Sequence, residues 1–149
     1  MTHIRVRATI DAPTDAVWAQ LADVAGHVRW MADAAAIRFT GERRSGVGTR
    51  FECDTRIGPL RTTDVMEVTE WREGGSLGVR HTGIVSGAGR FVLGGDGRTS
   101  TRVTWDERLR FPWWLGGPVT GLVAAPVLRR VWRGNLRRLG SLVQNRADG

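Results

Sequence analysis

The sequence predicts an α+β fold, in which an antiparallel sheet of about six to seven strands is followed by one long C-terminal helix. Residues 36–111 alternate between apolar and polar side chains and are divided by short Gly-rich turns, which is typical of neighbouring antiparallel strands. In residues 118–145 the apolar positions recur instead at helical spacing. The chain has 149 residues, enough for one domain, which we expect to span 1–149.

The first forty residues predict a strand and two short helices. Every second residue of 3–10 is apolar, which favours a strand with one buried face. Residues 11–14 interrupt this pattern, and we expect Thr14 to be the N-cap of a short helix. A second short helix is expected over residues 24–31.

The strands and the long helix follow from the period of the apolar residues and from the turns between them. Turn residues stand at 42–48, 58–59, 73–76 and 94–97. The long helix contains Pro126, which we expect to kink or split it. The strands are expected at residues 37–40, 49–56, 60–71, 77–81, 84–93 and 99–111.

The composition limits the available chemistry. The net charge is +7, from 22 basic and 15 acidic residues, and every basic residue other than histidine is arginine. Without lysine there is no Schiff base, and without tyrosine there is no phenol to act as a proton donor. The single cysteine, Cys53, excludes an internal disulfide and a cysteine-based zinc site. We expect no metal and no cofactor.

Charge and hydropathy also indicate location and partners. The first ten residues lack the apolar core of a signal peptide, so a cytoplasmic location is expected. Residues 111–128 carry no charge, but their prolines and glycines argue against a membrane span. The membrane contact that remains open is a transient one through Trp113 and Trp114. The arginines alternate with acidic residues and no nucleic-acid motif is present, so no nucleic-acid partner is expected.

Several short motifs, taken in order, resemble a known superfamily. They are IDAP at 10–13, AVW at 16–18, DVAGHVRW at 23–30, GVGTRF at 46–51, VTEW at 68–71 and TRVTW at 101–105. Together they resemble the START-like or SRPBCC proteins, in particular the small bacterial polyketide cyclase/dehydrase group. The resemblance covers nearly the whole chain. It implies a helix-grip fold, a curved sheet wrapped around the C-terminal helix with two short helices after the first strand and a cavity between sheet and helix.

Polar residues on the apolar face of the strands are candidates for the wall of this cavity. Strand parity places Cys53, Asp64, His81 and Glu107 on that face. A desolvated Glu107 carboxylate is suited to acid–base chemistry, and the alternative is a salt bridge with a neighbouring arginine. One interpretation of His81 is a general acid, a general base or a hydrogen-bond partner of the ligand. The alternative is a structural histidine near the end of a strand. Cys53 is expected as a small core residue rather than a nucleophile.

Large apolar side chains complete the expected ligand-binding wall. The alternative for the tryptophans is ordinary core packing. Trp113 and Trp114 stand in a Pro- and Gly-rich loop at the entry to the long helix, where they are expected to gate the cavity. The full ligand-binding set is Trp30, Phe51, Cys53, Asp64, Met66, His81, Trp105, Glu107, Trp113, Trp114 and Trp132.

Three functions remain open at this stage. The first is binding of a hydrophobic small molecule, such as a lipid, an isoprenoid or a polyketide, oriented by His81, Glu107 or Asp64. The second is a polyketide aromatase/cyclase or dehydratase with Glu107 or His81 as its catalytic base. An inward-facing Arg56, Arg80 or Arg90 would then stabilise the oxyanion, but cyclases of this family commonly use a pocket tyrosine, which is missing here.

The third function is a regulatory or interaction role, as in a toxin–antitoxin or stress pair. Its contact surface would be the arginine face of the long helix, with Arg133, Arg137 and Arg138. The chain is expected to be a monomer or a homodimer.

Overall fold

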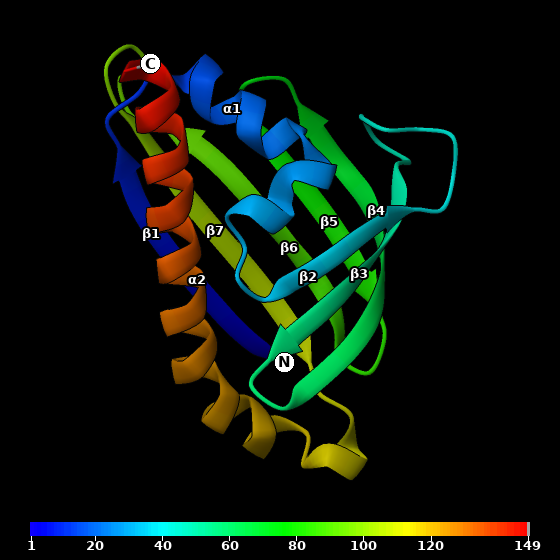
Figure 1. The fold of residues 1–149 in the computed structure, drawn as a ribbon. Helices are drawn as coiled ribbons and strands as arrows, with labels where there is room; N and C mark the ends of the chain where they lie inside the picture. Colours follow the sequence, from blue (N-terminus) through cyan, green and yellow to red (C-terminus); the bar gives the residue numbers. More distant parts are fainter. Residues whose placement is uncertain (149) are drawn as a thin grey trace.

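The computed structural model describes residues 1–148, with side chains described through residue 145. It shows seven strands, two α-helices and two short 3₁₀ helices (Figure 1). In chain order they are β1 (Thr2–Ile10), α1 (Thr14–Ala22), η1 (Val24–Arg29), β2 (Ala34–Phe39), β3 (Arg50–Ile57), β4 (Leu60–Arg72), β5 (Ser76–Thr82), β6 (Ser86–Gly94), β7 (Thr101–Arg110), η2 (Trp113–Leu115) and α2 (Pro118–Asp148).

The strands form one antiparallel sheet in the order β1-β7-β6-β5-β4-β3-β2. β2 to β7 pair in chain order, whereas β1 pairs with β7, so α1 and η1 carry the chain from one edge of the sheet to the other. Figure 1 shows the sheet curving around α2, which lies along β1 on the concave side. The predicted fold class, a helix-grip arrangement with a long C-terminal helix, is therefore confirmed.

The concave face holds the core because alternate residues of each strand point towards α2 and α1. On β1 these are Ile4, Val6 and Ile10, which are almost fully buried. α2 buries the stripe Leu128, Trp132, Leu136, Leu139 and Val143 against them. Each fully buried side chain of this size contributes roughly 1.5–3 kcal/mol.

The convex face of the sheet carries ion pairs between arginines and carboxylates. Glu67 on β4 lies between Arg50 of β3 and Arg80 of β5. Arg38 of β2 pairs with Asp54 of β3 in the same way. These partners are largely solvated, so each pair adds at most about 1 kcal/mol of stability. Several arginine side chains of the strands therefore pair with acidic side chains on neighbouring strands.

The structure corrects one local prediction and refines another. Thr14 does not cap α1: the helix begins at Thr14 itself, and the preceding Pro13 makes no side-chain cap. The Thr14 hydroxyl instead lies 3.3 Å from the Thr101 hydroxyl, and the Pro13 carbonyl accepts from the Val17 N–H at 3.3 Å, so Pro13 stands at the N-cap position. The second short helix is a 3₁₀ helix, capped by the Asp23 carboxylate accepting from the Gly26 N–H.

Pro126 does not split the long helix. α2 is continuous from Pro118 to Asp148, although its first turns run at an angle to the rest in Figure 1. Pro126 cannot donate to the carbonyl of Leu122, and both residues lie on the exposed side of the helix, where water can satisfy that carbonyl.

Candidate functional site

Four aromatic side chains fill the middle of the concave face. Trp30, Phe91, Trp105 and Trp132 are each 6% exposed or less. The rings of Trp105 and Trp132 stack, with centroids 5.0 Å apart and planes at 21°. Trp30 meets Phe91 and Trp105 edge-on, at 5.8 and 6.2 Å. Three of the tryptophans expected in a cavity wall thus pack on one another between the sheet and α2.

Two of the three indole N–H groups of this aromatic cluster donate to carboxylates. Trp105 Nε1 donates to Glu107 Oε1 at 3.0 Å, and Trp132 Nε1 donates to Asp33 Oδ2 at 3.2 Å. Trp30 Nε1 is buried without a hydrogen-bond partner among the described side chains and backbone. The cluster therefore leaves one buried donor for another acceptor.

A half-buried ion pair lies next to the aromatic cluster, towards the ends of β5 and β7. His81 Nε2 lies 3.0 Å from Glu107 Oε2, and the two side chains are 12% and 13% exposed. The pair bridges β6, which separates their strands. It can do so because β6 has glycines at the facing positions: Gly89 pairs with Glu107, and Gly87 pairs with His81. A Cβ at residue 89 would collide with the Glu107 carboxylate.

The surroundings favour a protonated His81. Burial acts to lower the pKa of the imidazole, but the hydrogen bond and charge of Glu107 outweigh it, and the pKa lies above its usual value. The Asp64 carboxylate and a hydrogen bond to the Val85 backbone act in the same direction. His81 and Glu107 together can therefore hold or transfer a proton near neutral pH.

Asp64 is a second buried carboxylate on this face. Its Oδ2 accepts a hydrogen bond from the Thr55 hydroxyl at 3.2 Å, while its Oδ1 is buried without a partner among the described residues. Gly83 leaves room for Oδ1, since a Cβ there would collide with it. Burial raises the pKa of Asp64 above its usual value. Asp64, Thr55, His81 and Glu107 are here called the polar cluster.

Cys53 lies beside the polar cluster as a buried thiol. Burial raises its pKa to about 11, so it stays protonated at neutral pH. It is 7% exposed and packs in the core. This is the environment of an inert thiol rather than of a nucleophile.

A second network, which the sequence reasoning missed, fastens α2 to the segment before β2. Asn135 is fully buried, and its Nδ2 donates to Asp33 Oδ1 at 2.7 Å. Its Oδ1 accepts from the Ala32 N–H and from Arg138, at 3.0 and 2.8 Å. The available signal was the position of Asn135 among the apolar residues of α2, where an unpaired amide would be costly.

The structure separates the remaining predicted residues. Phe51 is buried and Met66 half-buried on the concave face, as strand parity indicated. Trp113 and Trp114 instead lie outside, 87% and 60% exposed in η2, and do not join the other tryptophans.

The three arginines expected to face inward do not do so. Arg56 is exposed, Arg80 pairs with Glu67 and Arg90 pairs with Glu70 on the convex face. Each stands one residue away from an inward-facing position, so the strand turns its side chain outward. The expectation of an arginine oxyanion donor at these positions was wrong.

The clearest hollows lie away from the aromatic cluster. An open groove of about 330 Å³ is lined by Ala35 and by residues 54–56 and 61–63 around the β3–β4 turn. A smaller one of about 110 Å³ lies over Arg50, Glu67 and Arg80. Neither is the expected cavity between sheet and helix, and the aromatic cluster occupies that space.

Residues 1–145, whose side chains the structure describes, contain no group of three or more His, Cys, Asp or Glu side chains arranged to hold a metal ion. In the same part of the chain, no helix combines the length and the apolar character needed to cross a bilayer.

Comparison with known structures defines the class of protein. A START superfamily protein from Mycobacterium smegmatis superposes with a TM-score of 0.69 at 13% identity, over 99% of this chain and 98% of that one. An aromatase/cyclase from a Streptomyces species gives 0.75 at 20% identity, over 97% and 94%. A protein from Thermus thermophilus gives 0.75 at 17%, over 96% and 97%. The chain has the fold of the START-like proteins.

The sequence comparison then gives the family. The family described as "Polyketide cyclase / dehydrase and lipid transport" matches residues 1–144, and the chain belongs to it. Both activities in that description act on hydrophobic small molecules, which supports a hydrophobic ligand-binding fold. No curated protein sequence matches the chain.

Proposed function

We propose that this protein binds a flat hydrophobic small molecule that carries hydroxyl or keto groups. The polar cluster supports this proposal most directly: two carboxylates and a histidine line the concave face, and one carboxylate oxygen, Asp64 Oδ1, has no partner. A buried oxygen of this kind costs about 1–3 kcal/mol when nothing bonds to it. A ligand hydroxyl donating to Asp64 would remove that cost.

The apolar part of the ligand would lie against the aromatic cluster. Its rings offer flat faces, and Trp30 Nε1 offers a free donor for a ligand carbonyl. Because these rings fill the space between sheet and helix, binding requires them to move apart. The apolar contact would contribute about 25 cal/mol per Å² before the entropic costs of binding.

A matched pair of probes tests both parts of the proposal. We would titrate the protein with 2,6-dihydroxyanthraquinone, whose hydroxyls make no internal hydrogen bond, and with anthraquinone, which lacks the hydroxyl groups, and follow tryptophan fluorescence. The dihydroxy compound should bind more tightly, by about tenfold for one added hydrogen bond. Asp64→Asn and Glu107→Gln should reduce this difference, and Val47→Ser on the distant β2–β3 loop should not. Equal binding of both probes would show that the polar cluster does not contact the ligand.

The protein as purified offers an independent test. Native mass spectrometry followed by solvent extraction should identify a bound molecule with an apolar body and at least one hydroxyl or keto group. A co-purifying saturated hydrocarbon chain without such groups would contradict the proposed ligand class.

The His81–Glu107 pair favours one second candidate, a cyclase or dehydratase acting on a poly-β-keto chain. The pair would take a proton from a CH₂ group between two carbonyls, and the resulting enolate carbon would attack a ketone carbon of the same chain. Proton return to the new alkoxide gives a β-hydroxy ketone, loss of water gives an enone, and enolisation of the remaining ring ketones then gives the aromatic ring. Deuterium exchange at the CH₂ of pentane-2,4-dione, measured by NMR with wild type and Glu107→Gln, distinguishes this candidate from simple binding.

A further inference from the structure

Large apolar side chains gather at one end of the molecule. The strand register places the β3–β4 turn, the β5–β6 turn and the exit from β7 at the same end, because Ile57 pairs with Leu60, His81 with Gly87, and Ser86 with Arg110. η2 and the start of α2 follow directly from β7, and in Figure 1 they lie at the same end of the molecule as the β3–β4 turn. We call this the hairpin end.

The exposure at the hairpin end is unusually high for apolar residues. Trp113 is 87% exposed, Leu122 77% and Val123 71%. Leu60 and Ile84, at the tips of the two turns, are 58% and 46% exposed. Large exposed apolar side chains gathered at one end of a protein indicate an interaction surface.

The charge at this end has one sign. Residues 55–63, 82–89 and 108–128 contain no Asp or Glu, and they contain four arginines, Arg56, Arg61, Arg108 and Arg110. The opposite end, with the start of α1 and the β4–β5 and β6–β7 turns, carries charges of both signs, Asp11, Asp15, Glu73 and Asp96 with Arg72 and Arg98. The apolar end of the molecule is therefore also an end with net positive charge.

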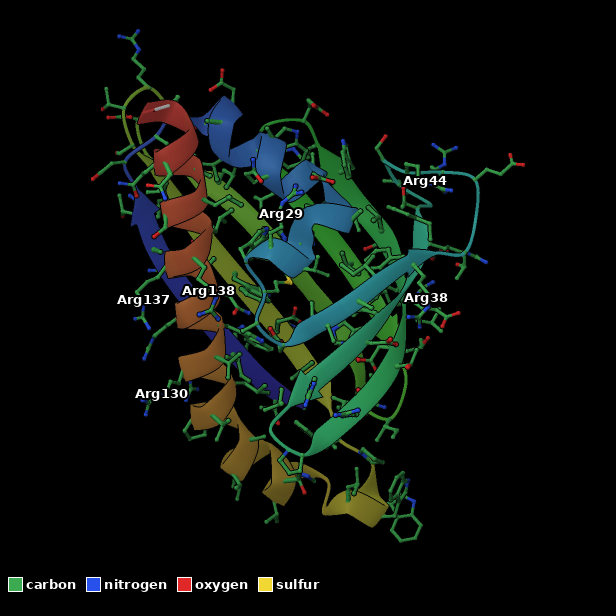
Figure 2. The ribbon with its side chains drawn as sticks, in the orientation of Figure 1. Arg29, Arg38, Arg44, Arg130, Arg137 and Arg138 are labelled. Carbon is green, nitrogen blue, oxygen red and sulfur yellow. The ribbon has the colours of Figure 1, made fainter. Side chains whose placement is uncertain are left out.

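The outward side of α2 continues this arrangement. Its exposed residues are apolar from Val119 to Val127 and become arginine at Arg130, Arg133 and Arg137. Figure 2 shows Arg130 and Arg137 projecting from α2 away from the sheet. The apolar part extends about 16 Å along the helix axis before the first of these arginines.

We propose that the hairpin end docks onto the surface of an anionic phospholipid bilayer. Tryptophan partitions into the bilayer interface, and an amphipathic helix buries its apolar side there while arginines above it contact the lipid phosphates. The charge favours a lipid surface over a second copy of this chain. Two copies meeting through this end would bring arginines together with no acidic residue of residues 55–63, 82–89 and 108–128 to match them.

Vesicle co-sedimentation tests the docking directly. We would compare sucrose-loaded vesicles of phosphatidylcholine with vesicles in which roughly one third of the lipid is phosphatidylglycerol. The protein should bind the anionic vesicles at least tenfold more tightly, and added salt should weaken this binding. Trp113→Ala/Trp114→Ala and Leu122→Ser/Val123→Ser should each reduce binding at least tenfold. Val47→Ser, which also removes an exposed apolar side chain but lies in the β2–β3 loop, should leave it unchanged.

The result that overturns the proposal is equally direct. Failure to sediment with anionic vesicles at low salt, or undiminished binding by both double variants, rules out docking through this end. A concentration-dependent dimer that the same variants abolish, seen by light scattering, would assign the surface to a second copy instead. These measurements need no ligand on the concave face, so they can succeed or fail independently of the anthraquinone titrations.

Discussion

The aromatic cluster and the polar cluster lie on the same face and partly on the same strands, but they differ in how completely they are packed. On β5 the inward residues change from fully buried Leu77 to half-buried His81, and on β7 from Trp105 to Glu107. The aromatic rings pack on one another, and Trp132 brings α2 into the cluster. The polar side chains are more exposed and leave Asp64 Oδ1 unpaired. Stability is therefore concentrated in one cluster, and the groups available for chemistry in the other.

The largest expected effect is a loss of stability in the aromatic cluster. Trp105→Ala removes a buried ring that stacks on Trp132 and should lower the free energy of unfolding by about 3–5 kcal/mol. Urea unfolding followed by circular dichroism measures this. Trp114→Ala is the matched control, because its ring is 60% exposed and its loss should cost less than about 0.5 kcal/mol. Similar losses in both variants would contradict the contrast between the two positions.

A smaller loss of stability is expected when a side chain is added at Gly89 of β6, over which His81 and Glu107 meet. Gly89→Ala would push Glu107 away from His81 and leave the imidazole without its acceptor, for a loss of about 1–3 kcal/mol. Gly94→Ala on the same strand is the control, since a Cβ there meets nothing within 4 Å. If the two variants are equally stable, the glycine at residue 89 is not needed for the pair.

The glycines of β6 also show where sequence reasoning succeeded and where it stopped. The alternation of apolar residues was sufficient to predict the strands, the long helix and the inward direction of Asp64, His81 and Glu107. It could not show that His81 reaches Glu107, because that contact depends on Gly87 and Gly89 of the strand between them. Those glycines were visible in the sequence, and alternate glycines in a strand indicate a close approach over it.

Contacts between a helix and a distant part of the chain could not be predicted from the sequence either. The link between Asn135 and Asp33 joins residues far apart in the chain, and its only sequence signal is one amide in an apolar stripe. The inward placement of Arg56, Arg80 and Arg90 failed for a simpler reason. Strict strand parity, which worked for their neighbours, sends all three to the convex face.

The pH dependence of stability should reflect the His81–Glu107 pair. Because the folded-state pKa of His81 is raised, the pair stabilises the fold fully below the unfolded histidine value of about 6.5, and this stabilisation is lost as pH rises through the folded value. Glu107→Gln should therefore cost about 1 kcal/mol more at pH ~5.5 than at pH ~9. Urea unfolding of wild type and variant at both values checks this, and a cost that does not change with pH would mean that His81 is neutral throughout.

The smallest expected effect has the opposite sign. Because burial raises the pKa of Asp64, its charged form disfavours the folded state, and the penalty appears as pH rises through the folded value. Asp64→Asn keeps the shape without the charge, so it should be more stable than wild type by about 0.5–1 kcal/mol at pH ~8 and equally stable near pH ~4. The same variant should bind 2,6-dihydroxyanthraquinone less tightly. A variant that gains stability and loses binding would identify Asp64 as a residue kept for its ligand rather than for the fold, whereas a loss of stability at pH ~8 would make it a structural partner of Thr55.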